Sequence, residues 1–222
     1  MGLCPEVNQR EDINQNNYFK LCKKMKIFRS LYTNWKTQGY GLENTKPEML
    51  PLYQSLGLFG HNGWDWAAGD GQKIHWDCDI EGEVLNTSTD AKGGLGVEVL
   101  TKDIDGMFIH RFWHLKSFAC QAGQKLGSGD LIGLADSTGW STGPHLHRDL
   151  KRVERDQFGN YKTLNGDNGY FGCIDPTPYF ENIFVVDKME HLKKQVEILT
   201  EQVSIWKKLI ELWKKLKFPL IL

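Results

Sequence analysis

The sequence has no cysteine pattern that would hold a small fold together. Its cysteines, an odd number scattered along the chain without any C-x-x-C pair, are Cys4, Cys22, Cys78, Cys120 and Cys173. Disulfide frameworks and cysteine zinc sites both show paired, closely spaced cysteines. Neither is indicated, and we expect mostly reduced, buried thiols.

Long apolar runs are also missing. No stretch reaches the roughly 18 apolar residues of a membrane-spanning helix, so we expect no transmembrane span. The first residues, MGLCPEVNQREDINQNN, lack the apolar centre of a secretory signal, and Glu6 stands where a myristoylation signal has Ser or Thr. If the protein works outside a cell, we expect something other than its own signal peptide to take it there.

Charge of one sign does not dominate the chain. The formal net charge is −1 over 222 residues, which gives no general reason to expect nucleic-acid binding. The balance is uneven, however, because residues 188–217 carry eight lysines and four glutamates, a local +4 against about −5 elsewhere. The length allows one sizeable domain and an appendage.

Residues 1–50 form an N-terminal extension that is polar at first and then basic and aromatic. We expect it to be partly helical, with a helix near residues 16–35. Apolar residues recur there at roughly helical spacing, at Phe19, Leu21, Met25, Phe28 and Leu31.

Residues 51–184 have a different texture, in which glycines separate short apolar runs such as GVEVLTK, MFIHRFWHL and DLIGLAD. Short runs between turn residues predict β-hairpins. The expected fold class is therefore mainly β (α+β): an antiparallel sheet or sandwich-like domain, with a helical N-terminal segment and a C-terminal helix.

Residues 185–222 show a heptad pattern. Apolar residues alternate three and four apart, at Met189, Leu192, Val196, Leu199, Val203, Trp206, Ile210 and Trp213. Ile198, Ile205, Leu209, Leu212 and Leu216 widen this face beyond a two-stranded seam. We expect residues 188–217 to form a homo-oligomer or dock on a partner. Packing on the chain's own domain and contact with a membrane surface through Trp206, Trp213 and the lysines are the alternatives.

The segment STGPHLH, residues 141–147, carries the clearest chemical signal. Pro144 suits the first position of a strand, because it has no N–H to give to a neighbouring strand. Alternation then puts His145 and His147 on one side and Leu146 towards the core. The pair could serve one metal or catalytic site, or could be two polar residues on a solvated face.

Two further pairs could complete such a site. His61 and Asp65 lie four apart in HNGWD, where a local hydrogen bond within a loop is an equal alternative. His110 and His114 lie four apart in HRFWH, and one of them could join the site. For His110, as for His75, we expect a structural role.

Together these segments resemble the lysostaphin-type, LytM-like zinc metallopeptidases, which cut peptidoglycan peptides. The family pattern is similar to HNGWD, then WHL, then STGPHLH, in this order and with a glycine-rich run before the last motif. The resemblance covers about residues 55–182. Three motifs in register are more specific than any one of them.

The resemblance implies the family's duplicated-hybrid-motif fold and a role for each residue. His61, Asp65 and His147 would bind one Zn²⁺, and His114 and His145 would be the catalytic pair. Three N/O ligands leave an open position for water, which is typical of catalytic zinc. The expected activity is hydrolysis of peptide cross-links in bacterial peptidoglycan. Together with the missing signal, it favours a bacteriophage lysin or virion enzyme, located in the virion or in the host cytoplasm before release.

The alternative from another class is a non-catalytic wall-binding or virion assembly module with the same fold. Such relatives lose ligands, whereas all five positions are intact here. The departures from the family pattern lie beside the ligands. Trp64 and Trp66 stand where the family often has smaller residues, and they either wall the groove or fill the core. Arg148 stands where the family often has an aromatic or aliphatic residue. Residues 151–170 resemble an inserted loop at the groove rim.

Overall fold

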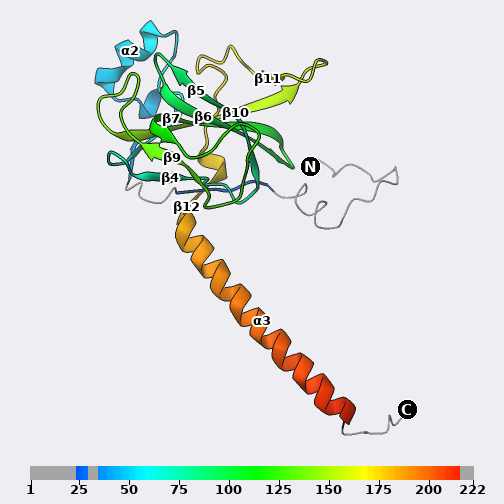
Figure 1. Cartoon of the computed structure of the whole chain (residues 1–222). Helices are drawn as coiled ribbons and strands as arrows, with labels where there is room; N and C mark the ends of the chain where they lie inside the picture. The colour runs from blue at the N-terminus through cyan, green and yellow to red at the C-terminus, as the bar shows by residue number, and fades with distance from the viewer. Residues whose placement is uncertain (1–23, 30–34, 216–222) are drawn as a thin grey trace. The chain divides into compact units, whose positions relative to one another are not determined.

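A computed structural model of the chain describes residues 24–29 and 35–215 (Figure 1). The chain divides into two compact units, Met1–Val185 and Val186–Leu222. Within the part that is described, no helix combines the length and the apolar character needed to cross a membrane.

The first unit is built on a ten-stranded, antiparallel sheet. Its main path runs β2-β3-β10-β7-β6-β5-β8; β11 adds to β10, and β9 pairs with β7 and β4. The strands are β2 (Lys36–Gln38), β3 (Trp64–Ala67), β4 (Lys73–His75), β5 (Gly82–Asp90), β6 (Gly94–Asp103), β7 (Gly106–Phe118), β8 (Lys125–Leu126), β9 (Leu131–Ala135), β10 (His145–Arg155) and β11 (Tyr161–Thr163). The mainly β, antiparallel fold expected from the glycine-punctuated runs is confirmed.

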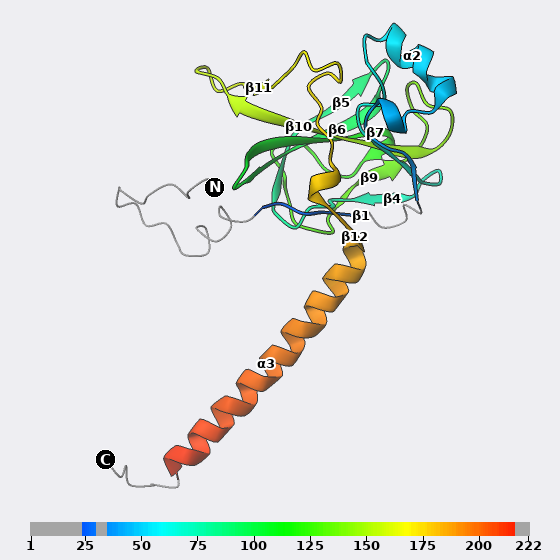
Figure 2. The same ribbon diagram turned by 180° about the vertical axis from the view of Figure 1, so that it is seen from behind.

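A second, two-stranded sheet joins the two ends of this unit. Strand β1 (Ile27–Arg29) runs parallel to β12 (Phe180–Phe184), and the two lie side by side in the reverse view (Figure 2). The remaining short helices are η1 (Leu42–Asn44), η2 (Pro47–Met49), α2 (Leu50–Ser55) and η3 (Thr177–Tyr179).

The helix predicted near residues 16–35 is wrong where it can be compared, because residues 27–29 form β1. Ile27 and Phe28 are buried in the core, and the Phe28 N–H donates to the Asp77 carbonyl at 2.6 Å. Pairing with distant segments has overridden the local spacing. Residues 16–23 and 30–34 lie outside the described part. The helical content of the described N-terminal segment is the single turns η1 and η2.

The core lies against the side of the sheet that carries Leu146 and Leu150 of β10, both of which are buried. Trp64 and Trp66 fill this core: their rings pack edge-on against each other at 5.9 Å between centroids, and Phe180 covers both. Of the two roles that the sequence left open for these tryptophans, wall of the groove or filling of the core, the structure shows the second.

Cys78, Cys120 and Cys173 are free and buried, as expected, and Cys4 and Cys22 lie outside the described residues.

The stretch 151–170 is not a loop throughout. Its first residues continue β10 to Arg155, and a turn returns the chain as β11, with Val153 paired to Thr163. Helix α3 (Val185–Lys215) makes up the described part of the second unit, so the predicted C-terminal helix is confirmed up to residue 215.

Candidate metal centre and active-site groove

Strand β10 lies between β3 and β7, and this order brings the separate motifs together. His147 is directly opposite Asp65 of β3 on one side and Trp113 of β7 on the other. His61 lies just before β3, where it bridges to Gly41. Because side chains alternate along a strand, β10 presents His145, His147 and Asp149 on one face and buries Leu146, Arg148 and Leu150 on the other.

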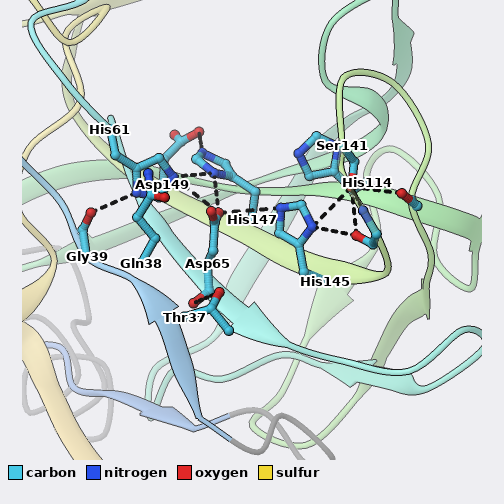
Figure 3. Close-up of polar contacts among 12 residues, drawn as sticks. Thr37, Gln38, Gly39, His61, Asp65, His114, Ser141, His145, His147 and Asp149 are labelled. Carbon is cyan, nitrogen blue, oxygen red and sulfur yellow. Dashed lines mark hydrogen bonds and ion pairs between the residues drawn. The ribbon is translucent and has the colours of Figure 1, made fainter. Parts of the chain in front are cut away.

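Three of the predicted residues converge on one point (Figure 3). Asp65 Oδ1 lies 3.2 Å from His61 Nε2 and 2.9 Å from His147 Nδ1, and these two nitrogens are 3.1 Å apart. One ligand atom from each residue falls within 4.8 Å of the others. The structure therefore brings His61, Asp65 and His147 together, as the sequence predicted, while their role as ligands stays a prediction.

The opposite ring nitrogen of each of these histidines faces an acceptor. His61 Nδ1 lies 2.7 Å from the Gly39 carbonyl, and His147 Nε2 lies 3.5 Å from Asp149 Oδ2. Carbonyl and carboxylate oxygens only accept, so these nitrogens carry the hydrogen. Without a metal, His147 is protonated and its Nδ1 donates to Asp65 Oδ1 at 2.9 Å. A bound metal would displace this proton, and His61 Nε2 and His147 Nδ1 would then both direct lone pairs at the shared point, as metal-binding histidines need.

His114 and His145 form a pair beside this three-residue cluster, with ring centroids 4.6 Å apart. His114 Nδ1 donates to the Thr138 carbonyl at 2.7 Å, and His145 Nδ1 donates to the Gly143 carbonyl at 2.9 Å. Their Nε2 atoms are therefore unprotonated when the rings are neutral. His145 Nε2 lies 3.6 Å from Asp65 Oδ1, so this pair borders the same space.

The backbone at His114 is strained. Its φ of +62° lies in the left-handed region, which residues with a Cβ rarely adopt. Its N–H nevertheless donates to the Gly93 carbonyl at 3.1 Å, which helps to hold the conformation. Strain of this kind persists where the surroundings fix it and is concentrated at functional sites.

Burial and neighbouring charges shift the pKa values of His114, His147 and Asp65, which line the groove. Burial, together with His145 and His147, lowers the pKa of His114 to about 4, so this ring is neutral near pH 7. Burial opposes protonation of His147 too, but Asp149 and Asp65 outweigh it and raise its pKa to about 9. Burial would raise the pKa of Asp65, yet His61 and His147 hold it well below its usual range. Asp65 is thus a carboxylate at neutral pH.

The cluster of His61, Asp65 and His147 and the His114–His145 pair line a groove of about 540 Å³. One wall comes from the segment before β3, where Tyr53 of α2 packs its ring 5.6 Å from that of His61. Gln38 Nε2 donates to Tyr53 Oη at 2.9 Å, so the tyrosine keeps its own proton to donate. Sequence reasoning missed Tyr53, because no spacing links it to the histidine motifs.

Asp149 and Arg111 were also missed. Asp149 is fully buried behind His147, and Arg111 Nε donates to its Oδ1 at 2.7 Å. Burial would raise the pKa of Asp149, but Arg111 and His147 hold it well below its usual range. The alternation that joins His145 to His147 continues to Asp149, so this residue could have been found from the strand pattern.

His110 and His75 lie away from the groove, in agreement with the structural roles expected for them. His110 is buried on the core side of β7, where Arg148 Nη2 donates to its Nδ1 at 2.7 Å. His75 Nδ1 donates to the Gly129 carbonyl at 2.8 Å. Arg148 itself pairs with buried Asp77 through two hydrogen bonds of 2.6 and 2.9 Å.

The sequence of the groove-forming segment matches a known family, peptidase family M23, over residues 59–165. This segment is a peptidase family M23 domain. The matched range includes His61, Asp65, His114, His145 and His147. It does not include Tyr53 or α3. The predicted lysostaphin-type family is thereby confirmed.

Two curated proteins illustrate the similarity of this M23 domain to bacterial enzymes. A glycyl-glycine endopeptidase, ALE-1 of Staphylococcus capitis, is 35% identical over 96 residues, 41% of this chain and 25% of the relative. A DD-carboxypeptidase/endopeptidase, Mpg of Neisseria meningitidis serogroup B, is 36% identical over 103 residues, 46% of this chain and 22% of the relative. The chain thus spans about a quarter of the length of the curated relatives that it matches.

Among solved structures, the catalytic domain of lysostaphin from Staphylococcus simulans is similar with a TM-score of 0.48 and 23% identity. The similarity covers 65% of this chain and 90% of that domain.

Proposed function

We propose that this protein is a zinc-dependent endopeptidase that hydrolyses peptide cross-links of bacterial peptidoglycan. The observation that carries the proposal is the convergence of His61, Asp65 and His147 within 4.8 Å, beside the His114–His145 pair. The M23 match supports a metallopeptidase, and the names of the relatives, a glycyl-glycine endopeptidase and a DD-carboxypeptidase/endopeptidase, support this substrate class.

The residues present fit zinc. Two imidazole nitrogens and one carboxylate oxygen form the three-ligand N/O set of catalytic zinc sites, which keep a further position open. The acceptors behind the ligands agree with this assignment: Asp149 behind His147 and the Gly39 carbonyl behind His61 direct the correct nitrogens inward. A zinc ion bound there would polarise the scissile carbonyl and lower the pKa of water towards about 7.

In this proposal the His114–His145 pair carries out the proton transfers. His145 Nε2 faces the ligand cluster with its lone pair, because Nδ1 is committed to Gly143, so it takes a proton from the attacking water. The protonated ring then gives this proton to the leaving amine. His114 is held neutral by its surroundings, and its Nδ1 donates to Thr138, so its unprotonated Nε2 can accept a proton or a hydrogen bond in the groove. Tyr53, which also lines the groove, offers its hydroxyl proton to the developing oxyanion.

A serine nucleophile is disfavoured by the same hydrogen bonds. Ser141 Oγ lies 3.1 Å from His145 Nδ1, but Nδ1 carries the hydrogen that the Gly143 carbonyl accepts. The Ser141 hydroxyl also donates to Gly143 at 2.7 Å. His145 therefore cannot serve as the base for Ser141 in this arrangement, and direct attack by water is favoured.

The test is digestion of purified peptidoglycans of several chemotypes by the full chain, with the products identified by mass. New amino termini within cross-links, lost on chelation and restored by zinc, are expected. His145→Ala is the matched control, because it should retain zinc and release no products. Digestion that is unchanged by chelation would contradict the zinc mechanism, and intact cross-links in every chemotype would contradict the substrate class.

The alternative, a non-catalytic module on the same fold, is distinguished by metal content. A purified protein without stoichiometric zinc, and without the ability to take it up, would favour that alternative. The bond that is cut, a stem-peptide cross-link or a glycine bridge, follows from the digestion products. The phage origin and virion location predicted from the sequence stay predictions, which mass spectrometry of purified virions would test.

We also propose that residues 188–217 have a docking role separate from catalysis, through self-association or on another surface. The supporting observation is that the apolar side chains of α3 between Val196 and Trp213 are 48–65% exposed.

A further inference from the structure

Helix α3 runs without a break from Val185 to Lys215, so residues that share a helical face can be identified from their positions. Between residues 193 and 213 every side chain is exposed. We call the following set the apolar face of α3: Val196, Ile198, Leu199, Val203, Ile205, Trp206, Leu209, Ile210, Leu212 and Trp213.

The apolar face is wide. At 3.6 residues per turn its members spread over roughly 200° of the helix circumference, with Gln195 and Gln202 inside this arc and Lys194 at one edge. A two-stranded coiled-coil seam uses a narrow stripe of a and d positions, about two residues in seven. A face that covers more than half of the helix fits a broad apolar surface better than one partner helix.

The residues beside the heptad seam also disfavour a second copy of this helix. The e positions hold Lys193, Thr200 and Lys207, and the g positions hold Gln195, Gln202 and Leu209. Parallel helices pair g with e, and antiparallel helices pair e with e and g with g. No acidic residue stands at either position in this stretch, so neither orientation gains an ion pair. The antiparallel orientation can bring lysines together.

Charge and aromatic residues gather towards the end of the helix. From Val203 to Lys215 the sequence has four lysines, two of them Lys207 and Lys208, and one acid, Glu211. Both tryptophans of α3, Trp206 and Trp213, lie in this stretch and are 65% and 57% exposed. Tryptophan on the apolar face, with lysines on the polar side, is the pattern of helices that lie in a membrane interface.

We propose that the C-terminal half of α3 binds the surface of an anionic phospholipid bilayer, with its apolar face among the acyl chains and its lysines among the headgroups. This interaction would be a second property of the chain, independent of hydrolysis. An anionic bilayer offers two things that a second copy of this helix does not: an extended apolar layer for the wide apolar face, and negative charge for the lysines beside it.

The test is flotation of the full chain with vesicles of phosphatidylcholine alone and of phosphatidylcholine mixed equally with phosphatidylglycerol. Binding is expected only to the mixed vesicles, and raised salt should weaken it. Replacing Lys207 and Lys208 by Gln should weaken binding about thirtyfold, since each interfacial lysine contributes about 1 kcal/mol. Replacing Trp206 and Trp213 by Ala should abolish it, while circular dichroism shows that the helix is kept.

Glu197→Gln with Glu201→Gln is the matched control, because it changes two charges on the same helix without removing a cation, and it should not weaken binding. Equal binding to neutral and anionic vesicles would overturn the proposal. Failure to bind either kind of vesicle would also overturn it. If the protein then had a dimeric or larger mass that the tryptophan substitutions abolish, a second copy would be what covers the face. Hydrolysis of soluble peptidoglycan fragments should be unchanged in the lysine variant, which separates this test from that of the enzyme.

Discussion

The two faces of strands β7 and β10 each present a histidine and an arginine, and on each face the arginine pairs with an aspartate; on the core face that aspartate, Asp77, comes from the segment between β4 and β5. On the core face, His110, Arg148 and Asp77 form a buried group, and on the groove face His147, Asp149 and Arg111 form another. In both, an arginine donates to an aspartate in the vicinity of a histidine. The difference lies in what the histidine's second nitrogen meets.

In the core group, both ring nitrogens of His110 form hydrogen bonds within the protein. Arg148 donates to Nδ1, and Nε2 lies 2.9 Å from the Thr101 hydroxyl. In the groove group, Asp149 faces only Nε2 of His147, and Nδ1 is directed at Asp65 and His61. A buried histidine with one ring nitrogen directed at a point shared with other polar groups is chemically available, whereas one with both nitrogens held by core partners contributes to stability alone.

The largest expected effect comes from replacing each histidine by alanine. His147→Ala should lose zinc and at least about a thousandfold in activity, because metal polarisation supplies several kcal/mol to the transition state. His110→Ala should keep zinc but lose about 1–3 kcal/mol in stability, because Arg148 and Thr101 lose a partner. Metal analysis and chemical denaturation of both variants check this, and loss of zinc in His110→Ala would remove the distinction between the faces.

His145→Ala should retain zinc and lose activity by about a hundredfold to ten-thousandfold, as expected for a general acid–base group. His61→Ala and Asp65→Ala should instead lose both. Zinc content and peptidoglycan hydrolysis measured on the same preparations separate these outcomes. An empty metal site in His145→Ala would show that the roles within the H-x-H motif are assigned the wrong way round.

Asp149→Asn should weaken zinc affinity and activity by about ten- to a hundredfold, because the group that orients His147 loses its charge. Its counterpart on the core face, Asp77→Asn, should leave zinc affinity unchanged and reduce stability, because Arg148 keeps its charge in a buried position without its partner. Zinc titration by calorimetry is the measurement. Equal zinc affinity in Asp149→Asn and the unmodified protein would argue against the orienting role.

The smallest effect concerns pH. Burial and Arg148 hold the pKa of His110 well below 6.5 in the folded protein, whereas the unfolded chain takes up a proton near 6.5. Stability should therefore fall as pH drops below about 6.5, by up to about 1.4 kcal/mol per pH unit from this group. His110→Gln, which can accept from Arg148 and donate to Thr101, should show a shallower loss in denaturation curves between pH 7 and 5. An unchanged slope would contradict this account.

Much of the site could be predicted because it depends on local periodicity. The alternation of β10 puts His145 and His147 on one face whatever the rest of the chain does, and the three motifs are specific enough together to indicate the family. The same alternation extends to Asp149. The glycine-punctuated runs likewise predicted the antiparallel sheet, and the heptad pattern predicted α3.

What could not be predicted depends on which segments become neighbours. Residues 27–29 have helical spacing but form a strand, because the edge offered by β12 and the segment at Asp77 satisfies their backbone. Tyr53 reaches the groove only because α2 packs beside His61. Sequence alone determined which residues can bind a metal and which face of their strand they share. The tertiary structure decided which histidines keep a free nitrogen, because that depends on hydrogen-bond partners far away in the chain.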